Sequence, residues 1–176
     1  MLSGRGGGSL TPEGRQQAEQ LADRLAGRGI AAIHASPQLR TRETAEAVGR
    51  RLGVPVEVVP ALDEIDFGAW TGRTFVNLAG DPAWDAWNNR RSVARIPGGE
   101  TMAEAVARAV GHMRQAASGA PLLCVTHCDI IRGVVAEGLG LSFDNMLRFD
   151  VDPASVSTVL IERRGERVLR LNEGHE

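Results

Sequence analysis

The segment PLLCVTHCDIIRG (121–133) decides the fold, because a strand and a helix meet inside it. LLCVT (122–126) is a continuous apolar and β-branched run, which predicts a short strand buried on both faces. DIIRGVVAEGLG (129–140) places apolar residues at 130, 131, 134, 135 and 139, the spacing of an amphipathic helix. His127 therefore lies where a strand ends and a helix begins. In a parallel sheet that edge binds ligands, and the amides of the following helix favour an anion.

The rest of the chain alternates strands and helices in the same way. Helix starts are marked by Thr11-Pro12, by Ser36-Pro37 as the predicted cap of the second helix, and by a capping box of Thr101 and Glu104. In the first third of the chain we predict a helix from Pro12 that ends at Gly27 and Gly29, a strand at 30–35, a helix at 37–52 and a strand at 54–59. An irregular segment follows at 60–99, with a helix at 81–89 inside it. The rest of the chain adds a helix at 102–117 and, after the strand and helix around His127, a hairpin at 155–172 that turns at Arg164-Gly165. This order predicts one α/β domain over 1–176, a three-layer sandwich with a mostly parallel sheet flanked by helices.

Composition narrows the class of protein. The chain has 176 residues, of which 43% are hydrophobic, and it contains no apolar run long enough to span a membrane. A net charge of −2 gives no reason to expect nucleic acid or an anionic membrane as a partner. Two cysteines make no disulfide framework, and no secretory segment opens the chain, so we expect a cytoplasmic protein.

Arg40 repeats the arrangement seen at His127. It lies one turn into the helix that follows the strand at 30–35, close to the amino end of that helix. A guanidinium can grip two phosphate oxygens at once, which a lysine cannot do. The alternative is a solvated helix arginine, and this is our interpretation of Arg42 and Arg50.

Three acidic residues follow the strand at 54–59 and so reach the same edge of the sheet: Asp63, Glu64 and Asp66. A carboxyl group there could protonate a leaving oxygen if burial raised its pKa. The residues alone do not separate the three candidates.

A metal site is not predicted. Cys124 and Cys128 flank His127, but one lies inside the strand and the other beyond its end, and no second group of Cys or His at ligand spacing occurs. The glycine-rich segment GRGGGS (4–9) precedes no strand that would make it a nucleotide-binding loop. For His127 itself, the alternative to a ligand-binding role is a core histidine bonded to the backbone.

Five stretches together resemble the histidine phosphatase superfamily, the phosphoglycerate-mutase-like family. They occur in the family's order and spacing: LTPEGRQQAEQLADRL (10–25), ASPQLRTRETAEAV (35–48), LDEIDFGAWTG (62–72), PGGET (97–101) and VTHCDIIRG (125–133). The resemblance implies a phosphoglycerate-mutase-like fold and chemistry on phosphate esters through a phosphohistidine, with no metal or other cofactor.

The resemblance also assigns roles to residues. Arg40 matches the arginine that holds the phosphoryl group, and Glu64 matches the acid for the leaving oxygen. His127 matches a second histidine that contacts the phosphoryl oxygens, followed here by Cys128 where the family usually has glycine. Ser3 and Gly4 match a loop that lines the pocket.

The chain departs from the family at its start. The family opens with a strand inside the sheet that ends in Arg-His-Gly, whose histidine is the nucleophile, and neither matches a segment of this sequence. His34 also ends a strand, but its position is not catalytic in the family. We therefore expect either a start upstream of Met1 or a sheet repaired by rearrangement or by pairing with another copy.

The sequence thus predicts a phosphomonoester hydrolase for a small phosphorylated metabolite, in preference to a mutase. Because the nucleophile is missing, the chain alone should have little activity. The alternative is a non-catalytic relic of the same fold that binds phosphate ligands or a protein partner. Oligomeric state stays open, with a homodimer as one option, and Trp84 and Trp87 fit either a pocket lining or the core.

Overall fold

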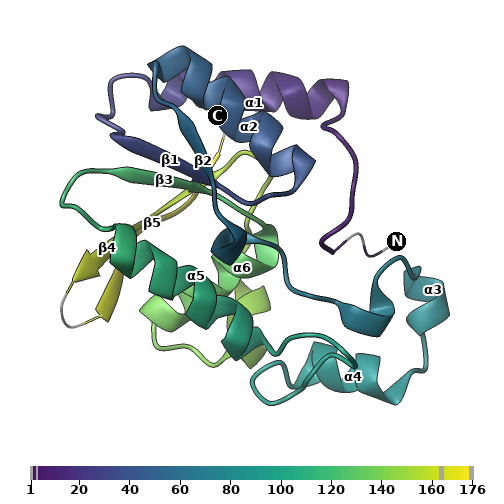
Figure 1. Cartoon of the computed structure of the whole chain (residues 1–176). Coiled ribbons are helices and arrows are strands. Elements are labelled where there is room, and N and C mark those ends of the chain that lie inside the picture. Colours follow the sequence, from purple (N-terminus) through teal and green to yellow (C-terminus); the bar gives the residue numbers. More distant parts are fainter. Residues whose placement is uncertain (1, 3, 163–164, 175–176) are drawn as a thin grey trace.

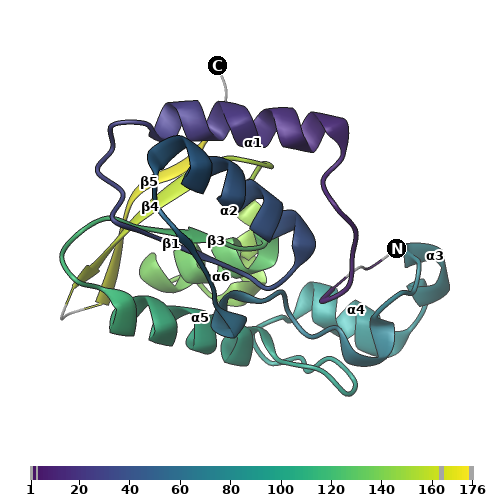
Figure 2. The same cartoon turned by 45° about the horizontal axis from the view of Figure 1, so that its top comes forward.

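The computed structural model describes residues 2, 4–162 and 165–174 and has three layers (Figures 1 and 2). The helices are α1 Pro12–Leu25, α2 Leu39–Leu52, α3 Phe75–Leu78, α4 Pro82–Asn89, α5 Met102–Ala116 and α6 Cys128–Gly138, with short 3₁₀ turns at Pro60–Leu62, Gly68–Trp70 and Phe143–Arg148. The strands are β1 Ala32–Ala35, β2 Val56–Val58, β3 Leu122–Val125, β4 Val156–Glu162 and β5 Gly165–Glu173. Helices α1 and α2 cover one face of the central sheet, and α5 and α6 cover the other (Figure 1). The predicted α/β sandwich is confirmed.

The central sheet is parallel, in the order β2-β1-β3. In its register Ala35 at the end of β1 lies beside Val125 at the end of β3, so the two strands finish at the same level. The prediction that β3 is buried on both faces is wrong, because all of its residues are half-buried. The physical reason is its place at the edge of the sheet: its second side pairs with no strand among the described residues.

The C-terminal hairpin forms a sheet of its own. Strands β4 and β5 pair antiparallel, as predicted for 155–172. The predicted turn at Arg164-Gly165 falls partly outside the described residues, since 163–164 are not among them. The molecule therefore has a three-stranded parallel sheet and a separate two-stranded ribbon beside it (Figure 2).

Helix ends follow the predicted capping rules with one exception. The Thr11 side chain caps α1, and Thr101 with Glu104 forms the expected capping box at α5. Gly53 ends α2 in the left-handed conformation, with φ 70°. The prediction that Ser36-Pro37 caps the second helix is wrong: α2 begins at Leu39 with Gln38 as N-cap. The Ser36 side chain is instead bonded to other residues of the site described below.

Two apolar clusters fill the spaces between the layers. On the α1–α2 face the cluster includes Leu21, Ile33 and Val48, and on the opposite face a larger one includes Trp70, Trp87, Met102 and Ile130. Trp87 is fully buried in the core, whereas Trp84 is half-buried and packs edge-on against Trp70 with ring centroids 5.2 Å apart. Within the described residues, none of the helices combines the length and the apolar character needed to cross a membrane.

Candidate functional site

Two strand-to-helix junctions meet at one edge of the sheet. The first leads from β1 through Ser36 into α2, and the second leads from β3 to His127, the N-cap of α6. The Ser36 amide donates a hydrogen bond of 2.9 Å to the Val125 carbonyl, which ties the two junctions together. The carboxyl edge of parallel strands is where α/β proteins bind ligands.

Arg40, Glu64 and His127, the three residues singled out in the sequence, converge at this edge. Arg40 Nη2 donates to His127 Nδ1 at 2.9 Å. Glu64 Oε2 lies 3.6 Å from His127 Nδ1 and 3.9 Å from Arg40 Nη2. Their charged or polar ends thus face one small space, as the alignment of the two junctions predicts.

The N-terminal segment closes one side of this space. Arg40 donates to the carbonyl oxygens of Gly4 at 3.0 Å and Gly6 at 2.9 Å. Gly4 has a φ of +48°, and a Cβ there would lie 3.2 Å from Phe67, so glycine suits the position. Gly4 therefore borders the site, whereas Ser3 lies outside the described residues.

Glu64 has the environment expected of a proton donor. Burial, helped by the negative charge of Asp129, raises the pKa of Glu64 to about 7, although the Ile65 amide and Arg40 oppose the shift. A carboxyl group with this pKa is about half protonated near neutral pH. The chemistry available at this point of the site is transfer of a proton.

The other two acidic candidates both pair with Arg5 but differ in their hydrogen bonds. Asp63 Oδ1 accepts hydrogen bonds from the side chains of Ser36 and Gln38 and from the Glu64 amide. Asp66 accepts from the Gly68 amide and pairs with Arg5 at 3.3 Å. The tertiary structure therefore separates three carboxylates that residue type and position alone left equivalent.

His127 is buried and neutral. Its side chain is 3% exposed. Burial lowers the pKa of His127 to about 3, and the charges of Arg40 and Arg108 lower it in the same direction. The interpretation of His127 as a core histidine bonded to the backbone is wrong, because its ring nitrogens contact the side chains of Arg40 and Ser36.

Arg108 is a residue of this region that sequence reasoning missed. From α5 it donates to the carbonyl oxygens of Asp63 at 2.7 Å and Glu64 at 2.9 Å, and it pairs with Glu100 at 2.9 Å. Arg108 thus fixes the loop that carries Glu64. Its signal in the sequence is no stronger than that of any other helix arginine.

Several other residues considered in the sequence lie elsewhere. His34 is bonded to His112 of α5, with Nδ1 2.9 Å from Nε2. Arg42 and Arg50 form exposed ion pairs with glutamates, which confirms their interpretation as solvated helix residues. Cys124 is half-buried in β3, and Cys128 is exposed at the start of α6. Among the described residues, no three His, Cys, Asp or Glu side chains are grouped as a metal site would require.

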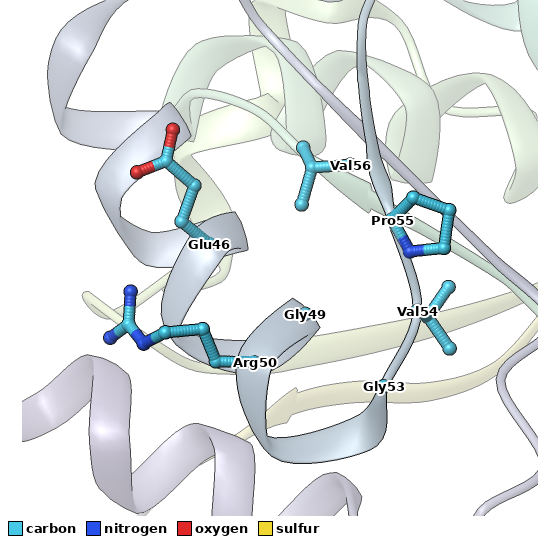
Figure 3. A pocket seen from close by; sticks show the side chains of 7 residues that line it. All are labelled: Glu46, Gly49, Arg50, Gly53, Val54, Pro55 and Val56. Carbon is cyan, nitrogen blue, oxygen red and sulfur yellow. The ribbon is translucent and has the colours of Figure 1, made fainter.

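A pocket at the far end of α2 is separate from this site. Figure 3 shows it between the last turns of α2 and the approach to β2. Its lining is Glu46, Gly49, Arg50, Gly53, Val54, Pro55 and Val56. None of the converging residues borders it, and Arg40 lies at the opposite end of the helix.

The fold and the site define an α/β protein whose charged and titratable side chains gather at the carboxyl ends of two parallel strands. The sequence pattern of the histidine phosphatase superfamily (branch 1) matches residues 1–174. The chain belongs to this family.

Known relatives extend the comparison. The bifunctional protein Rv2228c of Mycobacterium tuberculosis is 34% identical over 180 residues, which cover 96% of this chain and 48% of that protein. This chain therefore spans about half the length of the mycobacterial relatives that it matches. Phosphoserine phosphatase 1 of Hydrogenobacter thermophilus is 27% identical, with coverage of 93% and 80%. Among solved structures, Bacillus stearothermophilus YhfR superposes with a TM-score of 0.90 at 26% identity, covering 99% of this chain and 89% of that one.

Proposed function

We propose that the chain belongs to a phosphomonoester hydrolase that acts on a small phosphorylated metabolite through a phosphohistidine. The observation that carries the proposal is the convergence of Arg40, His127 and a readily protonated Glu64 within 4 Å of one another. A relative named as a phosphoserine phosphatase favours hydrolysis over phosphoryl transfer within the substrate.

Each of the three residues has a role that follows from its chemistry. Arg40 binds two phosphoryl oxygens through its guanidinium, exchanging its contacts to the Gly4 and Gly6 carbonyls for the stronger pair with an anion. Glu64, with a pKa of about 7, protonates the leaving oxygen. His127 contacts the phosphoryl group from the amino end of α6, where the helix dipole favours negative charge. Gly4 lines the pocket, and no cofactor takes part.

The nucleophile is proposed to come from a strand that pairs with the second edge of β3. Of the histidines that the structure describes, His34 and His112 are bonded to each other, which leaves His127 as the one at the site. A parallel strand beside β3 would end next to His127, as β1 does on the other side. That strand would also cover an apolar surface that extends from β3 to the start of β4. Residues encoded upstream are the proposed source, and a second copy of the chain is the alternative.

The test compares two proteins: the chain as given and a longer form that includes the residues encoded upstream. With a panel of alkyl and aryl phosphates, the longer form should turn over substrate. The chain alone should show only the small residual rate that binding and electrostatics supply without a nucleophile. Glu64→Gln in the longer form should slow alkyl phosphates, which have poor leaving groups, far more than aryl phosphates.

Three results would change the proposal. Anion binding without turnover in the longer form would favour the non-catalytic reading of the fold. Full turnover by the chain alone, abolished by His34→Ala, would make His34 the nucleophile. A dimer of the chain with full activity would indicate that a second copy supplies the missing strand.

A further inference from the structure

His127 is bonded through both of its ring nitrogens, and this fixes its tautomer. Arg40 Nη2 lies 2.9 Å from Nδ1, and Ser36 Oγ lies 2.7 Å from Nε2. A guanidinium can only donate, so Nδ1 must accept and the proton of the neutral ring must be on Nε2. Nε2–H therefore donates to the Ser36 hydroxyl.

The Ser36 hydroxyl continues the chain of hydrogen bonds in the same direction. Having accepted from His127, it donates its own proton to Asp63 Oδ1 at 3.2 Å. Ser36 is 0% exposed, so bulk water does not compete for these bonds. Asp63 Oδ1 also accepts from Gln38 Nε2 and from the Glu64 amide, both at 2.8 Å. These donors hold the carboxylate in place behind the serine.

This arrangement matters when an anion enters the site. Phosphoryl and sulfate oxygens only accept hydrogen bonds, so they would meet a lone pair on Nδ1 of the neutral ring. The repulsion disappears if Nδ1 gains a proton, because the ring then donates from Nδ1 to the anion and from Nε2 to Ser36. The second proton comes from solvent and makes His127 an imidazolium.

The charges that face the ring decide whether this imidazolium is stable. Arg40 from α2 and Arg108 from α5 oppose a positive ring, and an anion bound by Arg40 removes part of that opposition. Asp63 and Glu64 favour a positive ring, with carboxylate oxygens 3.9 Å from Nε2 and 3.6 Å from Nδ1. Asp63 is the better placed of the two for a lasting role, because Glu64 is needed as an acid.

We infer that Ser36 and Asp63 are positioning residues for His127. Together with Arg40 at Nδ1, they hold the proton on Nε2 in the free site, and they stabilise the imidazolium that an anion bound at Nδ1 requires. The second half of this inference rests on the proposed function. The first half concerns the free chain and does not depend on it.

The experiment is nitrogen-15 NMR of the histidine rings in the full chain, with and without sulfate, which does not titrate near neutral pH. The chain contains four histidines, so His127 can be assigned by elimination with His34→Asn, His112→Asn and His175→Asn variants. In the free chain we expect the Nε2–H tautomer, and with sulfate an imidazolium. Ser36→Ala leaves Arg40 at Nδ1, so it should keep the Nε2–H tautomer, but it removes the acceptor of Nε2–H and should therefore shift the Nε2 resonance and weaken sulfate binding. Asp63→Asn keeps an acceptor for Ser36, so it should keep the tautomer but bind sulfate about 10-fold more weakly, as expected for losing a charged hydrogen-bond partner.

Asp66→Asn is the matched control, because Asp66 lies in the same loop but is bonded to Arg5 and Gly68. It should leave both the tautomer and the sulfate affinity unchanged. An Nδ1–H tautomer in the free chain, or an unchanged Nε2 resonance in folded Ser36→Ala, would overturn the inference even if sulfate binds. Failure of sulfate to bind, with the tautomer results as expected, would instead count against the proposed function and the imidazolium.

Discussion

Two glutamates show how differently this molecule treats the same side chain in two regions. At the site, burial raises the pKa of Glu64 to about 7. At the start of α5, a hydrogen bond from Arg95 and the Thr101 amide lower the pKa of Glu104 to about 2. Glu104 completes a capping box, whereas Glu64 is held away from water beside a second carboxylate. One carboxyl is arranged to stay ionised and the other to carry a proton.

The helix N-termini of the two regions also differ, because those away from the site are capped by side chains and those at the site are not. Side chains of Thr11 and Thr101 cap α1 and α5, so these helices satisfy their own amides. The N-caps of α2 and α6, Gln38 and His127, make no capping hydrogen bond in the described structure. Both uncapped ends point at the site. Helix N-terminal amides thus lack a capping side chain where an anion can bind them, and they have one where they serve only the stability of the fold.

The largest expected effect concerns the pH dependence of stability. Folded Glu64 keeps a proton between its unfolded pKa of about 4.3 and its folded pKa of about 7, so the free energy of unfolding falls as pH rises through this window. Relative to Glu64→Gln, the free energy of unfolding of the wild-type chain should fall by about 3 kcal/mol between these two pH values. Urea unfolding at a series of pH values measures the difference. The contribution of His127 is common to both proteins and cancels.

Glu104→Gln is the control for that measurement. Because the folded pKa of Glu104 is lowered, its contribution is present above the unfolded pKa and is lost only as pH falls toward 2. It should therefore leave the slope between about pH 4.5 and 7 unchanged. Equal curves for wild type and Glu64→Gln would mean that Glu64 is not held protonated.

Arg40→Ala tests the open end of α2. It removes a bidentate, charge-assisted contact, so sulfate binding should weaken by about 1.5–3 kcal/mol in a calorimetric titration. Arg42→Ala, in the same helix but paired with Glu46 on the surface, should bind like wild type. An anion that binds equally to both variants would lie somewhere other than this site.

Gly133→Ala tests the packing of α6 against α5, because α6 has no capping side chain to stabilise it. A Cβ at this position would lie 2.3 Å from Val106 and 2.5 Å from the end of Met102, both on α5. We expect a loss of about 1–3 kcal/mol in the free energy of unfolding from overpacking. The matched control is Gly111→Ala on α5, where a Cβ meets nothing within 4 Å and the helix should gain up to about 1 kcal/mol.

Thr101→Ala should have the smallest effect and should affect stability alone. Loss of the capping bond to the Glu104 amide costs about 1 kcal/mol of unfolding free energy, and sulfate affinity should not change. Thr101→Ser keeps the hydroxyl and should restore most of the loss. A change in sulfate affinity would show that the capped end of α5 and the site are coupled, which would contradict the contrast between the two regions.

Some misses in the sequence reasoning share a cause. Ser36 has the residue type and position of a helix cap, but the chain continues to Gln38 before α2 begins, and Ser36 turns to His127 instead. Arg108 looked like any other helix arginine until α5 packed beside the loop at 63–64. A short-range pattern predicts only the local contacts of a residue. It does not show when a contact to a residue distant in the sequence will replace them.

The sequence by itself determined the order of strands and helices, their caps at Thr11 and Thr101, and the family to which the chain belongs. These features depend on apolar periodicity and on hydrogen bonds between residues that are close in the sequence, so they can be predicted from the sequence. The tertiary structure alone decided which of Asp63, Glu64 and Asp66 is desolvated, because their burial and partners come from α2, α5 and the N-terminal segment. A pKa depends on everything that surrounds a group in space, and residues far apart in the sequence supply those surroundings here.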